Sequence, residues 1–163
     1  MNKVILATIG ACLLLCPVHG QQGAEKKMVI SDFEADAGEW TGLTLGEAGV
    51  NPDNDSKIAI TREAASVKTG KGALSYTYEI TPKIIRVLAL QKPLDLTGMK
   101  SLRFWVKCSQ ATSIIVGLGE ASGASYQANA HCPAGAWQEV AVNLDELTVD
   151  EPAKDPNGKL DLD

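Results

Sequence analysis

The stretch SLRFWVKC, Ser101–Cys108, alternates between large apolar side chains and other residue types. In an extended chain one face would carry the apolar residues Leu102, Phe104 and Val106. This period of two predicts a half-buried β-strand. Trp105 lies on the other face, between two cations, where water is expected. Either a neighbouring loop covers this tryptophan, or its ring is a flat surface on which a ligand stacks.

Short segments of the same kind fill most of the chain on both sides of this strand. The predicted strands are residues 28–34, 57–63, 73–80, 83–90, 102–107, 113–120, 125–132 and 137–144. Turn residues such as those at 70–72 (GKG) and 133–135 (PAG) separate them, and no segment keeps a helical period over three turns. Several short strands at this spacing predict an all-β sandwich or jelly roll.

The first twenty residues have the layout of a secretory signal peptide. Lys3 supplies a positive start, residues 4–15 are an apolar run, and residues 18–20 (VHG) precede a cleavage point before Gln21. The run is too short for a spanning helix. We predict a signal peptide at 1–20, a polar spacer at 21–27 and one domain at 28–163. The protein is then secreted or periplasmic.

A lipid-attachment box is an alternative interpretation of this leader. Residues 9–12 read IGAC, which would make Cys12 the lipidated residue of a bacterial lipoprotein. Three leucines follow Cys12 directly, where a mature lipoprotein usually becomes polar. The continuous apolar core favours the ordinary signal peptide.

Charge excludes two classes of partner. The 163-residue chain has a formal net charge of −5 at pH 7, and loss of Lys3 with the leader makes it one unit more negative. Its lysines and arginines are scattered and form no basic run. We therefore predict neither a nucleic acid nor a membrane as a partner.

Two cysteines, Cys108 and Cys132, remain after the leader is removed. Each ends a predicted strand, and we expect both at one end of the domain. An even pair in an oxidising compartment can form a disulfide. Two free thiols are the alternative.

Residues 113–132 predict a hairpin with one polar face. A turn centred on residues 122–124 would pair Ile115 with His131, Gly117 with Asn129, and Gly119 with Gln127. The polar members of these pairs then form an outward row beside two glycines. Hydrogen-bonding groups next to missing side chains make a shallow trough that suits a polyhydroxylated ligand. An ordinary solvated sheet face is the alternative.

Catalytic motifs are missing from the chain. His131 is the one histidine after the leader, and there is no H-E-x-x-H, G-x-S-x-G, phosphate-binding glycine loop or C-x-x-C. A Cys108–His131 thiol–imidazole pair would compete with a disulfide for the same sulfur. We predict that the protein is not an enzyme.

Three stretches in order carry a resemblance. They are residues 30–40 (ISDFEADAGEW), residues 69–78 (TGKGALSYTY), and residues 94–107 (LDLTGMKSLRFWVK) leading to 136–144 (AWQEVAVNL). Together they resemble the galactose-binding-like jelly-roll modules, meaning the non-catalytic carbohydrate-binding modules of secreted glycosidases, and the related complex I intermediate-associated protein domain. The similarity covers nearly all of the chain after the leader. It implies a two-sheet antiparallel jelly-roll sandwich with one glycan-binding sheet face.

The resemblance also implies which residues form the site. Strand 102–107 would pair with 137–144, and the hairpin would lie in the other sheet beside 83–90. The implied ligand-binding residues are Arg86, Gln127, Asn129 and His131. Trp105 would face the opposite side of the molecule as an alternative ligand face. The favoured interpretation is that the N-terminal segment or a loop covers it, with Arg103 and Lys107 extending past it to water.

A structural calcium ion is implied by the same resemblance. Glu34, with Asp32 nearby, and the backbone carbonyls of residues 68–71 match the positions that hold the ion in the relatives. A calcium ion takes six to eight oxygen ligands. A solvated acid at a strand end is the alternative.

The closing residues 159–163 (KLDLD) begin a new alternation that stops after Leu160 and Leu162. In the relatives this kind of turn leads into the closing strand, so the resemblance implies a jelly roll without its last strand. Its open sheet edge would be completed by a strand from a partner, or by the rest of a parent glycosidase.

The predicted function is a secreted non-catalytic carbohydrate-binding module that recognises a polysaccharide or glycan on one sheet face. The alternative is a structural or adhesion β-sandwich without a sugar ligand. Binding to immobilised glycans separates the two.

Overall fold

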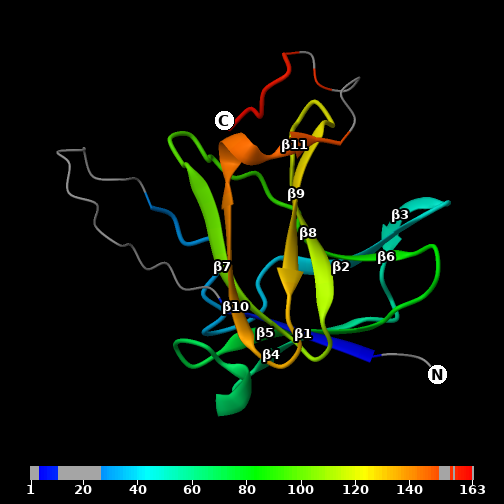
Figure 1. Ribbon diagram of the computed structural model, residues 1–163, viewed down its shortest axis with the longest axis vertical. Coiled ribbons are helices and arrows are strands. Elements are labelled where there is room, and N and C mark those ends of the chain that lie inside the picture. Colours follow the sequence, from blue (N-terminus) through cyan, green and yellow to red (C-terminus); the bar gives the residue numbers. More distant parts are fainter. Residues whose placement is uncertain (1–3, 11–26, 151–154, 156, 163) are drawn as a thin grey trace.

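The computed structural model describes residues 4–10, 27–150, 155 and 157–162 (Figure 1). The strands are β1 (Val4–Gly10), β2 (Trp40–Gly46), β3 (Gly49–Pro52), β4 (Lys57–Thr61), β5 (Ala73–Glu79), β6 (Ile85–Leu90), β7 (Ser101–Cys108), β8 (Thr112–Gly119), β9 (Ser125–Cys132), β10 (Trp137–Asn143) and β11 (Thr148–Val149). Two 3₁₀ turns complete the described elements, η1 (Ala64–Ser66) and η2 (Leu144–Glu146). The prediction of an all-β fold is confirmed.

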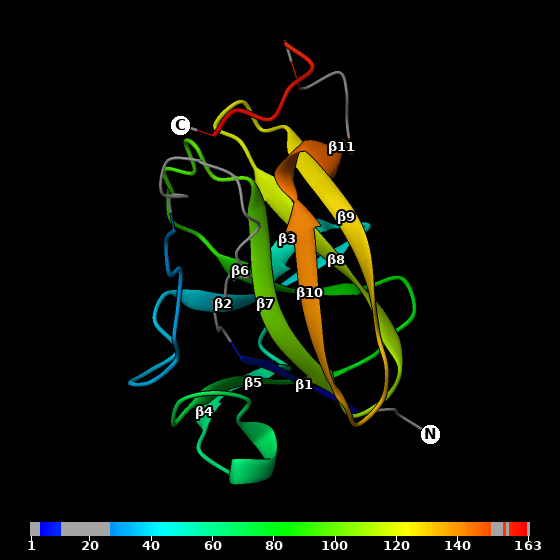
Figure 2. The same ribbon diagram turned by 60° about the vertical axis from the view of Figure 1, so that its left-hand side comes forward.

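The strands form three antiparallel sheets. One has five strands in the order β10-β7-β1-β5-β4, and the other two have the orders β11-β9-β8 and β3-β2-β6. The β8–β9 hairpin lies against the β7–β10 pair, as Figures 1 and 2 show. The main core fills the space between these two layers and includes Val106, Val116, Tyr126, Val140 and Val142. This arrangement is consistent with a β-sandwich.

The alternation of apolar and polar residues in the sequence predicted the positions of most of the strands. Strands β4 to β10 each coincide with a predicted segment to within two residues at either end. The predicted pairing of β7 with β10 is also confirmed, with Trp137 opposite Lys107 and Asn143 opposite Ser101. Val106 of β7 and Val140 of β10 are 1% and 4% exposed, and their side chains pack into the core.

The prediction of a first strand at residues 28–34 is wrong. This segment has no regular structure, and Phe33 has a φ of 58°. The side chains of Asp32 and Asp36 accept hydrogen bonds from the backbone amides of Glu34 and Gly38 at 3.1 and 2.8 Å. Aspartate side chains that bond to nearby amides favour turns over a ladder.

Strands β2 and β3 were not predicted, because glycines interrupt the alternation of β2. Gly42 packs near Asp53 and Tyr76: a Cβ there would be 3.4 Å from Cβ of Asp53 and 3.7 Å from the ring of Tyr76, which are ordinary contact distances.

The partner of β6 differs from the one that the resemblance implied. Strand β6 pairs along its whole length with β2, from Trp40 opposite Leu90 to Leu45 opposite Ile85. No ladder in the described chain joins β6 to the β8–β9 hairpin. The expected placement of residues 83–90 beside the hairpin is therefore wrong, because the unpredicted strand β2 takes that edge.

The hairpin register differs from the predicted one by two residues. Ser113 lies opposite His131, Ile115 opposite Asn129, and Gly117 opposite Gln127. The three-residue turn lies one residue earlier than predicted, at residues 121–123: the amide of Glu120 donates to the carbonyl of Ala124 at 2.9 Å, and Gly123 has a φ of 89°. A three-residue loop with glycine in the left-handed region is a standard hairpin turn. An even shift keeps each residue on its predicted face.

Residues 4–10, the apolar core of the predicted leader, form β1 between β5 and β7. Ala7 lies opposite Tyr76 on one side and Cys108 on the other. The predicted signal peptide therefore contributes an interior strand to the five-stranded sheet of the full chain.

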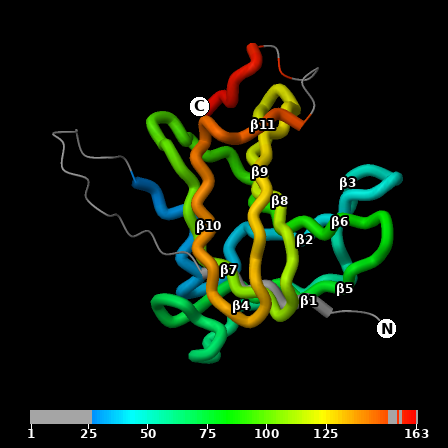
Figure 3. Tube along the Cα trace, viewed as in Figure 1, coloured from blue at the N-terminus to red at the C-terminus, as the bar shows by residue number. Residues whose placement is uncertain are grey.

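The last described residues, 157–162, form no strand. Leu160 and Leu162 pack against the main core, and the carbonyl of Leu162 accepts a hydrogen bond from the amide of Leu96 at 2.7 Å. Figure 3 shows this segment beyond the upper end of β10.

Candidate functional site

The outward face of the β8–β9 hairpin carries the predicted polar row. Asn129 and His131 are exposed, Gln127 is half-buried, and Ile115, opposite Asn129, is 54% exposed. Gly119 continues this face, and a Cβ placed there would meet no atom within 4 Å. The two glycines of β8 lie opposite Gln127 and Ser125, so only Gln127 of the predicted row has a glycine as its cross-strand neighbour.

Strand β11 holds one end of this row. The side-chain amide of Gln127 donates to a carboxylate oxygen of Asp150 at 2.9 Å, and the hydroxyl of Thr148 donates to the carbonyl of Gln127 at 3.2 Å. These bonds fix the position of Gln127. Asn129 and His131, further along β9, are the members of the row that are most exposed.

Arg86 lies away from this face in a buried ion pair. Its Nη1 is 2.5 Å from Oδ1 of Asp53, and the two side chains are 6% and 0% exposed. The hydroxyls of Ser56 and Tyr76 also donate to this carboxylate. Burial by itself would raise the pKa of Asp53, but the hydrogen bonds from Ser56 and from the Asp55 amide, and the charge of Arg86, lower it below its usual value. The structure therefore does not bring Arg86 together with Gln127, Asn129 and His131.

Trp105 is half-buried under the loop that precedes β5. The ammonium group of Lys68 lies 4.2 Å from the centre of its ring, a cation–π contact. Lys107 extends past the ring and donates to the carbonyl of Ala65 at 2.8 Å. Of the two interpretations of Trp105, these contacts are those of a tryptophan under a loop, which the sequence analysis favoured over a ligand-stacking surface.

Glu34 lies at the turn that the resemblance indicated. Its carboxylate accepts the amide of Lys71 at 2.9 and 3.1 Å. A Cβ at Gly70 would displace the Glu34 carboxylate, one of whose oxygens would lie 1.8 Å away, and the φ of 71° at Gly70 favours glycine at this position. Within the described residues, no three histidines, cysteines or acidic residues are placed to hold a metal ion. Glu34 and Asp32 thus cap backbone amides, and the calcium ion stays a prediction.

Cys108 and Cys132 are both fully buried, and their thiols are free. Burial, together with the smaller effects of the neighbouring Cys132 and the hydrogen bond with it, raises the pKa of Cys108 to about 12. The pKa of Cys132 is raised by burial as well. The structure therefore shows the alternative of two adjacent free thiols and not the disulfide.

We expect neither Cys108 nor Cys132 to react with a thiol reagent at pH 8 in the folded full chain, with β1 in place, because burial keeps both protonated and out of solvent. Both should react at once after denaturation in guanidinium. Intact mass spectrometry after labelling gives the count. A native mass about 2 Da below the dithiol value, with no labelling after denaturation, would instead identify a disulfide.

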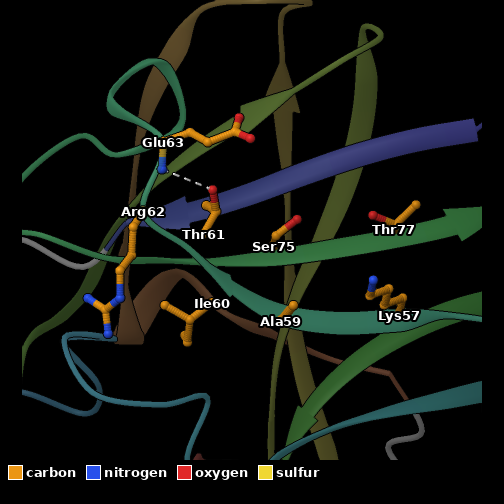
Figure 4. Close-up of a pocket in the computed structure, with 8 residues that line it drawn as sticks. All are labelled: Lys57, Ala59, Ile60, Thr61, Arg62, Glu63, Ser75 and Thr77. Atoms are coloured by element: carbon orange, nitrogen blue, oxygen red, sulfur yellow. Dashed lines mark hydrogen bonds between the residues drawn. The ribbon is translucent and has the colours of Figure 1, made fainter.

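A second hollow lies on the outer face of β4 and β5 and has a volume of about 320 Å³ (Figure 4). Small side chains such as Ala59 and Ser75 form its centre, and Lys57, Arg62 and Glu63 surround it. The alternation within β4 (KIAIT) and β5 (ALSYTYE) places these small residues on the outer face. This pattern could have indicated the hollow, but the sequence analysis did not use it.

Comparison with models of protein families, with curated proteins and with solved structures found no match for this chain. Among the residues that the structure describes, no helix is long and apolar enough to cross a membrane. The geometry by itself defines the class: an all-β domain of several antiparallel sheets, with a polar, exposed hairpin face as its candidate site.

Proposed function

We propose that this protein is a secreted, non-catalytic binding domain whose β8–β9 face contacts a glycan. The observation that carries the proposal is the exposed pair Asn129 and His131 on one face of β9, opposite Ile115 and Ser113 of β8. A side-chain amide and an imidazole can each donate and accept hydrogen bonds, as recognition of sugar hydroxyls requires.

Ile115 supports the apolar part of the same contact. Sugar rings present C–H faces as well as hydroxyls, and binding sites combine apolar side chains with a few placed polar groups. Ile115 is 54% exposed and lies directly opposite Asn129, so the two can contact one ligand.

Removal of the Asn129 amide tests the proposal. Asn129→Ala should weaken retention on a bound polysaccharide by about 0.5–1.5 kcal/mol, because one hydrogen bond to the ligand is lost. Affinity electrophoresis in gels that contain plant or microbial polysaccharides measures the retention. The melting temperature should change little, since the side chain faces water.

Asn143→Ala is the matched control, because Asn143 is an exposed asparagine at the end of β10, on another sheet. Equal retention of Asn129→Ala, Asn143→Ala and the wild type on every polysaccharide that binds would exclude the hairpin face. Trp105 would then become the candidate.

A structural or adhesion role without a sugar ligand is the second candidate. Its support is a stripe of exposed apolar residues across the β3-β2-β6 sheet: Val50, Leu45 and Ile85 lie side by side and are 63%, 41% and 51% exposed. Exposed apolar patches are typical of protein–protein contact sites. Self-association in the absence of any glycan binding would favour this role.

A further inference from the structure

The position of β1 links the leader to the integrity of the sheet. Strand β1 pairs with β5 over residues 4–9 and with β7 over residues 7–10, antiparallel to both. The sequence predicts that residues 1–20 are removed on secretion. The secreted chain would then lack an interior strand of its five-stranded sheet.

The two strands beside the vacated position cannot pair with each other without a large shift. Adjacent strands lie about 4.8 Å apart, so β5 and β7 are separated by roughly 9.6 Å across β1. Backbone hydrogen bonds need N···O distances near 2.9 Å. The core residues of β5 and β7 beside this position are Leu74, Tyr76, Val106 and Cys108, and none of them is more than 4% exposed in the full chain. Loss of β1 would uncover these side chains together with two rows of backbone groups.

No other described segment after the leader is placed to fill the gap. Strands β2 to β11 each pair elsewhere, and residues 28–34 are held in an irregular path with Phe33 buried. The carbonyl of Leu162 is bonded to Leu96, and the amide of Leu144 is bonded to the carbonyl of Lys100, so the C-terminal segment lies where β7 begins. Strand β1 contacts the opposite end of β7, at residues 105–108.

We infer that the secreted protein has a strand-acceptor slot between β5 and β7, and that its occupant is an extended strand donated by a partner polypeptide. The inference rests on the predicted cleavage of the leader and not on glycan binding. Main-chain hydrogen bonds to two strand edges supply the affinity, and side-chain positions on the core face supply the specificity.

The register defines the chemistry of the donor strand. The central position of the slot lies opposite both Tyr76 and Cys108, which are 4% and 0% exposed, so a donor side chain there faces the core. The flanking positions on the same face lie opposite Leu74 and Tyr78. We expect apolar donor residues at all three positions, which in the leader sequence VILATIG are occupied by Ala7, Ile9 and Ile5. The position opposite Ser75 and Lys107 is on the outer face and accepts a polar residue. The donor is thus an uncharged strand of about seven residues that runs antiparallel to β5 and β7.

A partner fits the slot better than a second copy does. A second secreted copy would have to withdraw one of its own paired strands to donate it, since each of β2 to β11 is already in a ladder. A free extended segment of another polypeptide brings its backbone groups unpaired and loses no ladder on binding.

The test starts from the full chain, expressed with its leader and a C-terminal tag and purified from the secreted fraction. Intact mass must show that residues 1–20 are gone; a secreted protein that keeps them would overturn the inference. The processed protein is then titrated with a fluorescent peptide of residues 3–10 that carries two added N-terminal lysines. We expect one peptide per protein and binding at least about tenfold tighter than that of the Ala7→Pro peptide. Proline cannot donate to the ladder and is excluded from interior strands.

Hydrogen exchange gives a second readout that does not depend on mutation. The amides of residues 74–79 and 105–108 that point toward β1 should exchange fast in the processed protein and become protected when the peptide is added. The alternate amides that point toward β4 and β10, and those of the β2–β6 pair, should stay unchanged. Peptides that bind equally, or not at all, would overturn the inference. So would a processed protein that forms an exchanged dimer through this slot, because the occupant would then be a second copy.

Discussion

Replacing Arg86 by alanine is expected to lower the free energy of unfolding by about 3–5 kcal/mol. The change leaves the carboxylate of Asp53, whose side chain is fully buried, without its cationic partner. Breaking a buried pair at one side costs more than the pair contributes, because an uncompensated charge stays in the interior. Urea denaturation followed by circular dichroism measures the loss.

Lys83→Ala is the matched control for Arg86→Ala. Lys83 also forms an ion pair near β6, with Glu47 at 3.0 Å, but the two side chains are 77% and 81% exposed. Exposed pairs of this kind contribute about 0–1 kcal/mol, because water screens them and ordering their side chains costs entropy. Equal losses for the two variants would show that the Asp53–Arg86 pair is not buried in solution.

The same pair has a pH signature. The pKa of Asp53 is lowered in the folded protein, so its contribution to stability is present above the unfolded-state pKa of this carboxyl and is lost as pH falls through the folded-state value. Arg86→Ala removes one cause of the lowering, and the variant should therefore lose less stability than the wild type on acidification below pH 4.

Replacing Leu74 by alanine is expected to cost about 2–5 kcal/mol. Leu74 is 0% exposed in the middle of the β4–β5–β1 region, with Ile60 and Ile9 opposite it in the two ladders. Truncation removes buried methyl groups and leaves a cavity that a close-packed sheet fills only in part. Denaturant titrations measure the change in the free energy of unfolding, provided that its dependence on denaturant concentration has the same slope in the variant and the wild type.

Leu45→Ala removes the same atoms from a leucine that is 41% exposed on β2. Its effect should be well below that of Leu74→Ala, since little apolar surface returns to water. Comparable effects at the two positions would contradict the buried placement of β5.

The polar row of the hairpin could be predicted, because the alternation of a strand by itself determines which residues share one face. The exact position of the turn, residues 121–123, could not be predicted, since it depends on Gly123 adopting a positive φ and on the Ser122 hydroxyl bonding to Glu120 and to the Ala124 amide. The resulting shift of two residues left Asn129 and His131 outward but changed their cross-strand neighbours.

Arg86 shows why a site that is inferred from an assumed strand order can be wrong: the structure does not bring this residue to the hairpin face. Its assignment to the ligand face depended on β6 lying beside the hairpin, whereas β2 pairs with β6 and Asp53 comes from the turn after β3. A run interrupted by Gly42 and Gly46 gives no strong periodic signal, so neither β2 nor the buried pair was visible in the sequence.

By itself, the sequence determined the all-β class, the strands β4 to β10 and the outward faces of Asn129 and His131, because local alternation is enforced by the geometry of every extended chain. Only the tertiary structure decided which strands are neighbours, that Lys68 covers Trp105, that Arg86 is buried, and that residues 4–10 fill the place between β5 and β7. Contacts between residues far apart in the chain depend on which surfaces pack together, and alternation carries no information about that choice.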